Sequence, residues 1–162
     1  MTPVRKLPAE RWKDYRSLRL EALRQSPLAF GSAPEEEESL TEREWKKRMR
    51  NVRFAMSEGA PVGMIECTFN DSVKFRHVAE IFGFYVGPGH RGKGIGAALL
   101  DHALGLARRR KGVIKVRLFV NINQRAAMTL YRKAGFAVVG RSEREMKVKG
   151  RLYTMLVMEK ML

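Results

Sequence analysis

The sequence has a single cysteine, Cys67, among 162 residues, so no disulfide within the chain can staple the fold. Its three histidines, His77, His90 and His102, are widely separated and follow no zinc-ligand spacing,. No apolar run approaches the roughly 20 residues that span a bilayer, and the N-terminal segment lacks the apolar core of a signal peptide,. These absences predict a cytoplasmic protein with a hydrophobic core, no metal site and no membrane span.

Acidic residues are scarce in the second half of the chain. Residues 73–162 contain 19 Lys or Arg but 5 Asp or Glu, and no acid lies between Asp101 and Glu143. Residues 1–72 are nearly balanced, with 13 basic and 12 acidic residues. A net charge of +15 distributed in this way favours a polyanionic ligand, either nucleic acid or a multiply phosphorylated small molecule,. The plainer interpretation is a solvated basic surface, which accounts for part of the run 108–111.

Composition and periodicity predict one α+β domain over residues 1–162. The chain is 44% hydrophobic and 30% charged, and no repeat or low-complexity linker divides it,. Thr41 and Glu44 form a capping-box pattern that opens a helix,. The apolar spacing predicts helices over 12–25, 41–49, 94–111 and 123–134, and strands over 52–57, 62–69, 77–86, 113–120, 136–143 and 151–160,. The order of these elements indicates an antiparallel meander followed by a β-loop-α-β unit on a mixed sheet.

The stretch VGPGHRGKGIGAALL, residues 86–100, joins a predicted strand to a predicted helix and fits three phosphate-binding patterns. A nucleotide-triphosphate loop needs Ser or Thr after the lysine, where this chain has Gly94,. A dinucleotide loop needs an acid about 20 residues on, and that position falls in the acid-free span,. Arg91, Gly94 and Gly96 spell R-x-x-G-x-G, which is similar to the diphosphate loop of coenzyme A-dependent acyltransferases. Backbone amides at a helix N-terminus suit a diphosphate, although a tight turn alone would also need glycine.

A second motif lies in VNINQRAAMTLYRKAGF, residues 120–136. It matches the pattern N-x-x-A…LY-x-x-x-GF at Asn123, Ala126, Leu130, Tyr131, Gly135 and Phe136. With the glycine loop before it, this block resembles the GNAT superfamily of N-acetyltransferases. The N-terminal segment 12–37 is similar to the first-helix segment of bacterial members, so the resemblance extends over nearly the whole chain.

The resemblance implies a GNAT-type α+β fold: a mixed, mostly antiparallel central sheet flanked by helices, with splayed central strands that hold coenzyme A. It implies acetyl-CoA as the cofactor, a primary amine of a small molecule or peptide as the acceptor, and a homodimer as a common assembly. The pantetheine arm would pair with the strand at Phe84, Tyr85 and Val86. The diphosphate would lie on Arg91, Gly92, Lys93, Gly94, Ile95 and Gly96, and Asn123 would face the thioester.

Two catalytic residues follow from the same resemblance. Tyr131 matches the family's general acid, which protonates the leaving thiolate, and its alternative role is an aromatic anchor in the core. Glu80 lies where several relatives place a catalytic base, but a bulge in its strand would change the face on which it lies. Glu66 and His77 are weaker candidates for the base.

The acceptor site and two other functions stay open. The acids Glu35 to Glu38 are hypothesised to attract a cationic amine, with a solvated loop as the alternative. One alternative function is a basic nucleic-acid-binding module, which would need exposed aromatic side chains among the basic residues. Tyr131 and Phe136 lie in a pattern that favours burial, which argues against nucleic acid. The other alternative is a family member that binds the cofactor without catalysis.

Overall fold

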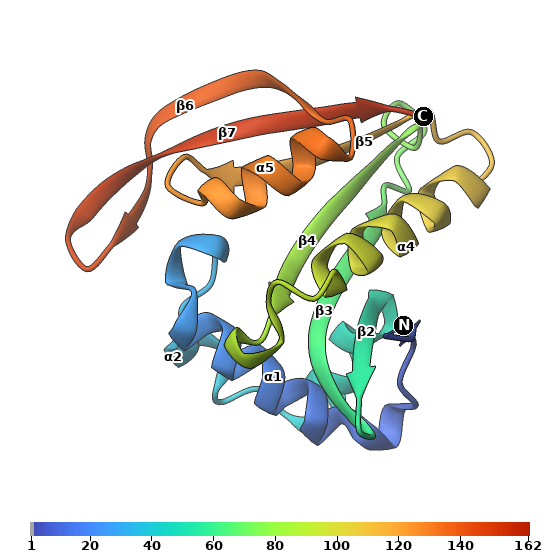
Figure 1. Cartoon of the computed structure of the whole chain (residues 1–162), viewed down its shortest axis with the longest axis vertical. Coiled ribbons are helices and arrows are strands. Elements are labelled where there is room, and N and C mark those ends of the chain that lie inside the picture. The colour runs from blue at the N-terminus through green and yellow to red at the C-terminus, as the bar shows by residue number, and fades with distance from the viewer. Residues whose placement is uncertain (1) are drawn as a thin grey trace.

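The computed structural model describes residues 2–162, which form a seven-stranded sheet flanked by helices (Figure 1). The strand order is β1-β2-β3-β4-β5-β7-β6. β4 and β5 are parallel, and the other neighbouring pairs are antiparallel. The strands are β1 (Val4–Arg5), β2 (Val52–Ser57), β3 (Ala60–Phe69), β4 (Val78–Val86), β5 (Lys115–Asn121), β6 (Ala137–Val148) and β7 (Arg151–Met161). The expected mixed, mostly antiparallel sheet is confirmed.

Helices cover both faces of this sheet. They are α1 (Trp12–Gln25), α2 (Pro34–Glu37), α3 (Glu42–Arg48), α4 (Ile95–Arg109) and α5 (Arg125–Lys133). One hydrophobic core joins α4 and α5 to the face of the sheet that carries Ile65 and Leu118. A second core joins α1 and α3 to the opposite face, around Trp45 and Phe54. The glycine-rich loop therefore connects the end of β4 to α4, which packs on this first face of the sheet.

The helix starts show where local sequence signals succeed and where they fail. The capping box is present, because Thr41 Oγ1 accepts a hydrogen bond from the Glu44 amide (3.3 Å) and the Glu44 carboxylate accepts one from the Thr41 amide (2.7 Å). The helix expected over 123–134 begins only at Arg125, so Asn123 lies outside it and Gln124 is the N-cap residue. The Asn123 amide instead donates to Asn121 Oδ1 at 2.9 Å. The asparagine two residues earlier thus organises this turn.

Three features of the fold were not predicted. β1 and α2 contain two and four residues, too few to carry a periodic pattern. β6 continues to Val148 rather than ending at residue 143. Its second half is mostly polar and exposed because it forms a long hairpin with β7 that extends past α5 (Figure 1).

The two central strands separate after a short paired stretch. β4 and β5 pair through Val78–Ile81 and Lys115–Leu118. Beyond this stretch β4 stays paired with β3 and β5 stays paired with β7, so β4 and β5 diverge (Figure 1). Backbone N–H and C=O groups on the facing edges of 82–86 and 119–121 are thereby left for a partner other than the neighbouring strand. The splay implied by the resemblance is present.

A β-bulge interrupts β4 where the splay begins. Glu66 pairs with Phe82 and Met64 pairs with Tyr85, so one residue of β3 faces two residues of β4. Gly83 lies in the bulge with a φ of +57°, a left-handed conformation that glycine adopts readily,. The bulge breaks the simple alternation of side chains along β4, which decides where each residue of this strand points.

Candidate active site

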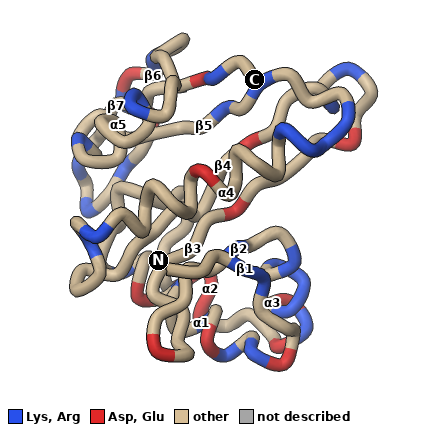
Figure 2. The backbone as a smooth tube through the Cα atoms, turned by 45° about the vertical axis from the view of Figure 1, so that its right-hand side comes forward, with Lys and Arg blue, Asp and Glu red and all other residues tan. Residues whose placement is uncertain are grey.

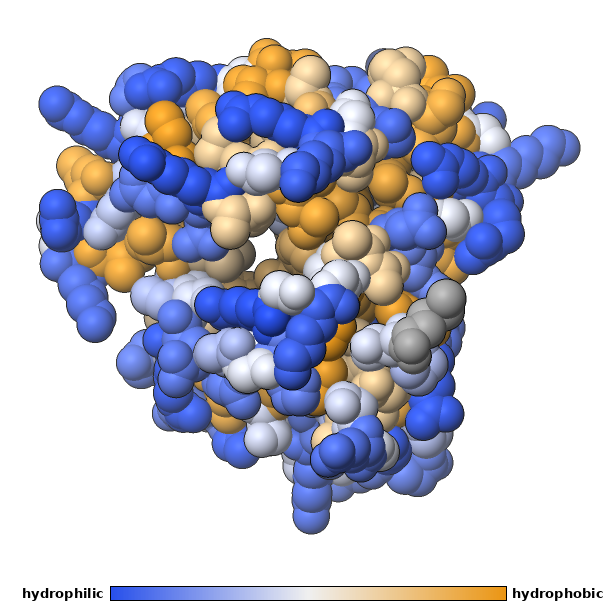
Figure 3. All heavy atoms as spheres, viewed as in Figure 1, coloured by the Kyte–Doolittle hydropathy of each residue, from blue (hydrophilic) through white to orange (hydrophobic). Residues whose placement is uncertain are grey.

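Two cavities lie in the splay and share part of their walls. The loop cavity, of about 590 Å³, is bordered by residues 25–29, the end of β4, the loop before α4 and the start of α5. The inner cavity, of about 460 Å³, is bordered by residues 28–32, the bulge in β4, the end of β5 and the β6–β7 hairpin. Phe84, Gln124 and Ala127 are among the residues that border both. The space-filling view is hollowed to an opening in this region (Figure 3).

The loop cavity reaches the N-terminus of α4. Gly94 is the N-cap residue with a φ of +78°, and Gly92 has a φ of +74°. The first helical hydrogen bond runs from the Ala98 amide to the Gly94 carbonyl oxygen (3.0 Å). The amides of Ile95 and Gly96 therefore precede the helical ladder and are available to an anion. Because Ile95 buries its side chain in the core, it offers the cavity its backbone.

Gly92, Gly94 and Gly96 in the loop are required for two different reasons. A Cβ on Gly92 or Gly94 would meet no described atom within 4 Å, so their left-handed φ is what favours glycine,. A Cβ on Gly96 would lie 3.3 Å from Leu130 and 3.4 Å from Phe84. Gly96 therefore allows α4 to approach α5 and β4 closely. Contact with the anion is thus not needed to explain this third glycine.

The two basic residues of the loop are folded back onto the backbone. Arg91 Nε donates to the Val86 carbonyl oxygen (2.8 Å), and its guanidinium carbon lies 5.7 Å from the Tyr85 ring centroid. Lys93 Nζ donates to the Gly89 carbonyl oxygen (3.1 Å). Both positive charges are held beside the N-terminus of α4, where they add to the potential that attracts an anion.

The end of β4 presents its residues to different surroundings. Phe84 borders both cavities, and Val86 borders the loop cavity. The Tyr85 ring packs in the α1 core, where its hydroxyl donates to Glu21 Oε1 at 2.8 Å. Burial, together with this bond to Glu21, raises the pKa of Tyr85 to about 12. Tyr85 thus anchors the splayed strand to α1.

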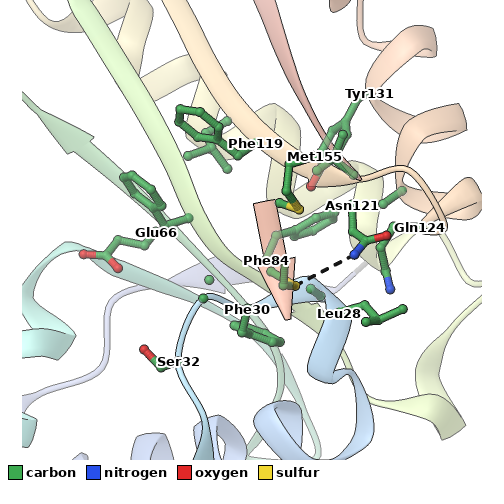
Figure 4. Close-up of a pocket in the computed structure, with 18 of the residues that line it drawn as sticks. Leu28, Phe30, Ser32, Glu66, Phe84, Phe119, Asn121, Gln124, Tyr131 and Met155 are labelled. Carbon is green, nitrogen blue, oxygen red and sulfur yellow. Dashed lines mark hydrogen bonds between the residues drawn. The ribbon is translucent and has the colours of Figure 1, made fainter. Parts of the chain in front are cut away.

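Tyr131 borders the inner cavity from α5 (Figure 4). The residue is 6% exposed, and its ring centroid lies 5.9 Å from those of Phe84 and Phe136. Burial raises the pKa of the Tyr131 hydroxyl well above its ordinary value. The phenol therefore stays protonated at neutral pH and is held in one orientation by two aromatic neighbours.

Glu66 borders the inner cavity on the side opposite Tyr131 (Figure 4). Burial raises the pKa of its carboxyl group, and the nearby charges of Arg19 and Arg48 oppose this shift in part. Such a carboxyl group binds a proton more readily than one in water. Glu66 ranked below Glu80 in the sequence because the family resemblance places a catalytic base at Glu80.

Glu80 lies away from both cavities within the described residues 2–162. It is in register with Thr68 on β3 and Arg117 on β5, where the central strands are still paired. Glu80 lies on the same face of the sheet as Glu66 and Phe82, but it precedes the splay and does not border the inner cavity. The position of Glu80 therefore does not support a role as the general base.

Asn123 is exposed and, within the part of the chain that the structure describes, borders neither cavity. Asn121 and Gln124 border the inner cavity in its place. Asn121 is 1% exposed, and its Nδ2 lies 3.8 Å from the Met146 sulfur in a weak hydrogen bond (Figure 4). Asn121 is the last residue of β5, one residue beyond the strand predicted over 113–120.

The acids of the first loop have structural partners. Glu37 is 1% exposed and accepts hydrogen bonds from Arg19 (2.8 and 2.9 Å) and Arg48 (2.9 Å). Burial opposes its ionisation, but the bonds and charges of these arginines hold the pKa of Glu37 below its usual value. Glu36 accepts a bond from the Ala33 amide, and Glu38 pairs with Arg24. These contacts contradict the hypothesis that the acids at 36–38 are free to attract an amine.

Neither a metal centre nor a bilayer span is present in the described range. Among residues 2–162, no three His, Cys, Asp or Glu side chains gather closely enough to hold a metal ion. No helix in this range combines the length and the apolar character that crossing a bilayer requires.

The family model described as "Acetyltransferase (GNAT) family" matches residues 12–136. An uncharacterized N-acetyltransferase of Methanocaldococcus jannaschii is 39% identical over 80 residues, which cover 48% of this chain and 35% of that protein. The match thus spans about a third of the relative's length.

Solved structures share the fold over the whole chain. A GNAT-family acetyltransferase from Streptococcus pneumoniae superimposes with a TM-score of 0.87 at 21% identity and covers 100% of both chains. A phosphinothricin acetyltransferase from Sinorhizobium meliloti, solved in complex with acetyl-CoA, gives a TM-score of 0.84 at 22% identity. That alignment covers 99% of this chain and 88% of the other.

Proposed function

The chain belongs to the GNAT acetyltransferase family, and from this premise we propose that it transfers the acetyl group of acetyl-CoA to a primary amine. The acceptor is a small molecule or peptide, and residues 1–162 act as one catalytic domain. The observation that carries the proposal is the shared wall of the two cavities. Phe84 borders both, so a donor anchored at the N-terminus of α4 can present its reactive end to Tyr131 and Glu66.

The residues around the loop cavity fit the donor. The first-turn amides of α4 suit a diphosphate, and the open space over Gly92 and Gly94 leaves the backbone accessible,. The facing edges of β4 and β5 offer backbone groups to an amide-rich arm, much as a sheet accepts an added strand,. The relative from Sinorhizobium meliloti, solved with acetyl-CoA, supports the same assignment. When bound, acetyl-CoA supplies a thioester whose carbonyl carbon accepts the amine.

We assign proton transfer to Tyr131 and Glu66. An attacking amine must be neutral, and the raised pKa of Glu66 suits a carboxylate that accepts a proton from the amine, directly or through water,. The protonated Tyr131 phenol can donate to the leaving thiolate. The two groups lie on opposite sides of the inner cavity (Figure 4), and we place the reacting carbonyl between them. Glu66 replaces Glu80 as the proposed base.

The walls of the inner cavity favour an acceptor with an apolar body. Aromatic and thioether side chains supply much of the lining: Phe30, Phe82, Phe84, Phe119, Met146 and Met155. Phe82 is 44% and Phe119 is 48% exposed, so apolar surface is available at the cavity. Arg19 also borders the cavity, but its guanidinium is bound bidentately by Glu37. Glu66 is therefore the charged group left to meet an amine, and an aromatic or aliphatic amine fits this lining best.

Thiol release from acetyl-CoA, measured against a panel of amines, tests the proposal. We expect turnover with aromatic or aliphatic primary amines and with peptides that begin with an apolar residue, and less with strongly acidic acceptors. If acetyl-CoA binds but no amine or peptide in the panel releases thiol, the chain binds its cofactor without catalysis. The homodimer implied by the resemblance stays a prediction, which light scattering tests.

A further inference from the structure

A pocket at the other end of α4 is lined by arginines. This arginine pocket, of about 210 Å³, is bordered by Arg53 on β2, Arg109 and Arg110 at the end of α4, and by Cys67, Phe69 and Leu106. No Asp or Glu within residues 2–162 borders it. Figure 2 shows Lys and Arg gathered at this end of α4. α4 contains 15 residues and is about 22 Å long, so the pocket is well separated from the glycine loop,.

Two of the three guanidinium groups contact other parts of the chain, and the third lies over its own helix. Arg53 Nη1 donates to the Val52 carbonyl oxygen (3.2 Å). The guanidinium carbon of Arg110 lies 5.3 Å from the Phe69 ring centroid. Arg109 folds back over its own helix, where its Nη1 would lie 3.2 Å from a Cβ on Gly105. Arg53 is half-buried, whereas Arg109 and Arg110 border the pocket with exposed side chains.

None of the three arginines has an acidic partner in the part of the chain that the structure covers. The ion pairs found there do not include them. Asp71 follows Phe69 by two residues but is exposed and forms no ion pair with the cluster in this range. Burial lowers the pKa of Arg53, and burial together with Arg53 and Arg109 lowers the pKa of His102. A half-buried guanidinium without a counter-charge is costly, which favours an anion from outside the chain.

Gly105 lies under the Arg109 guanidinium in the interior of α4. Glycine in the interior of a helix is less stable than alanine, and Gly105 has an ordinary helical φ,. A Cβ there would lie 3.2 Å from Arg109 Nη1, and the three nearest atoms all belong to the Arg109 guanidinium. The glycine therefore leaves room for the Arg109 guanidinium to fold over α4. The helix dipole explains basic residues in the last turn of α4 but does not explain Arg53, which comes from β2.

We propose that Arg53, Arg109 and Arg110 form a second anion site that binds a phosphate group. Planar guanidinium forks match phosphate oxygens in pairs, and a phosphate balances several positive charges in a volume of this size. The site is independent of acetyl transfer and of the glycine loop. Its phosphate comes from a free phosphorylated small molecule or from an RNA backbone, and the experiment below distinguishes the two sources.

Amide NMR during titration with inorganic phosphate tests the site directly. Ionic strength is kept constant with chloride, and saturating coenzyme A is present to occupy the glycine loop. We expect the Phe69 and Leu106 amides to shift, and Arg53→Gln to weaken this binding by roughly tenfold or more. Arg151→Gln removes one exposed charge on the hairpin and should leave the binding unchanged. Absence of shifts at Phe69 and Leu106, or equal affinity in Arg53→Gln, would overturn the proposal.

This readout separates the site from the proposed function. If the chain failed to bind coenzyme A, phosphate at the glycine loop would shift the amides of Gly92 to Gly96, while the arginine pocket would still be reported at Phe69 and Leu106. Failure of acetyl transfer therefore says nothing against the second site, and failure of the second site says nothing against acetyl transfer.

Gly105→Ala separates a binding role from a structural role. Alanine should raise the thermal midpoint because it is the better helix former. Its Cβ should also displace the Arg109 guanidinium and weaken phosphate binding severalfold. A variant that is more stable and binds phosphate as tightly as the parent chain would contradict the role of Arg109.

A short single-stranded RNA identifies the source of the phosphate. If RNA is the source, it should shift the same two amides more strongly than inorganic phosphate at equal phosphate concentration, and Arg53→Gln should lower the salt slope of RNA binding by about 1. If a small molecule is the source, inorganic phosphate should compete fully while RNA binds no better per phosphate. If neither ligand shifts these amides, the proposal is wrong.

Discussion

Glu66 on β3 lies directly opposite Phe82 on β4, immediately before the bulge at Gly83. This pairing fixes both residues beside the inner cavity, at the point where β4 leaves β5. A strand without the bulge would continue the alternation from Glu80 through Phe82 to Phe84 on one face. The bulge instead lets Phe84 reach the cavity wall and lets Tyr85 turn toward α1. The extra residue in β4 therefore decides which side chains beyond Gly83 reach the cavity.

Tyr131→Phe should lower kcat by about 10²- to 10⁴-fold, the range expected for loss of a general acid. The Michaelis constant for acetyl-CoA should change little, because the ring still packs between Phe84 and Phe136. Steady-state thiol release measures both constants. Tyr153→Phe on β7 serves as the control and should retain activity. Full turnover by Tyr131→Phe would show that the ring acts as an anchor alone.

Glu66→Gln should reduce kcat for the amine, whereas Glu80→Gln should have little effect. In the parent chain, activity should fall as the pH drops through the raised pKa of Glu66, because the base becomes protonated,. That limb of the pH profile should disappear in Glu66→Gln. The opposite ranking of the two variants would restore Glu80 as the base.

The same substitution should not destabilise the fold at neutral pH. A carboxyl group whose pKa is raised on folding binds its proton more tightly in the folded state, so its contribution to stability falls as the pH rises through that pKa,. Replacing Glu66 by a neutral amide removes this penalty. Urea unfolding at pH 7 should therefore give Glu66→Gln a free energy of unfolding equal to or above that of the parent chain.

Gly94→Ala should cost about 1 kcal/mol of stability, because alanine disfavours a φ of +78°,. It should also raise the Michaelis constant for acetyl-CoA, since relaxation of the loop moves the first-turn amides of α4. Gly89→Ala is the matched control: a Cβ there meets no described atom within 4 Å, and its φ is not positive. If both substitutions changed the Michaelis constant for acetyl-CoA equally, the left-handed conformation of Gly94 would not be what donor binding requires.

Glu37→Gln should destabilise the chain by about 3 kcal/mol at pH 7, because Arg19 and Arg48 lose a buried partner,. The lowered pKa of Glu37 means that its stabilising contribution is complete above the ordinary value of 4.5 and is lost as the pH falls through the folded-state pKa,. The difference between variant and parent should therefore shrink in strong acid. Glu38→Gln, whose Arg24 partner is exposed, should cost less than about 1 kcal/mol,.

Local patterns in the sequence were sufficient for most of the fold. The capping box at Thr41 and the strand-to-helix glycine loop both lie where their chemistry indicated. The family resemblance supplied the splay, which no periodicity encodes. The bulge at Gly83 was beyond reach, because glycine in a strand is compatible with several backbone shapes.

Burial explains the remaining differences at the candidate site. In the sequence, Glu37 looks equivalent to the three acids beside it. In the structure it is the one that is buried, because Arg19 on α1 and Arg48 on α3 bind its carboxylate. Asn121 and Asn123 are likewise equivalent in sequence, but the first faces the cavity and the second faces outward. Such choices depend on contacts between distant segments, which one sequence does not reveal.

The short pairing of β4 with β5 divides the sheet into two parts that are joined at one end. Within the described chain, four residue pairs join these strands, so the sheet consists of two ribbons hinged near Val78 and Lys115. A ligand bound between the separated strand ends would contact both ribbons, so their local unfolding would become cooperative. Backbone hydrogen exchange along 82–86 and 119–121 would then slow in concert, and resistance to proteolysis would rise across both halves at once.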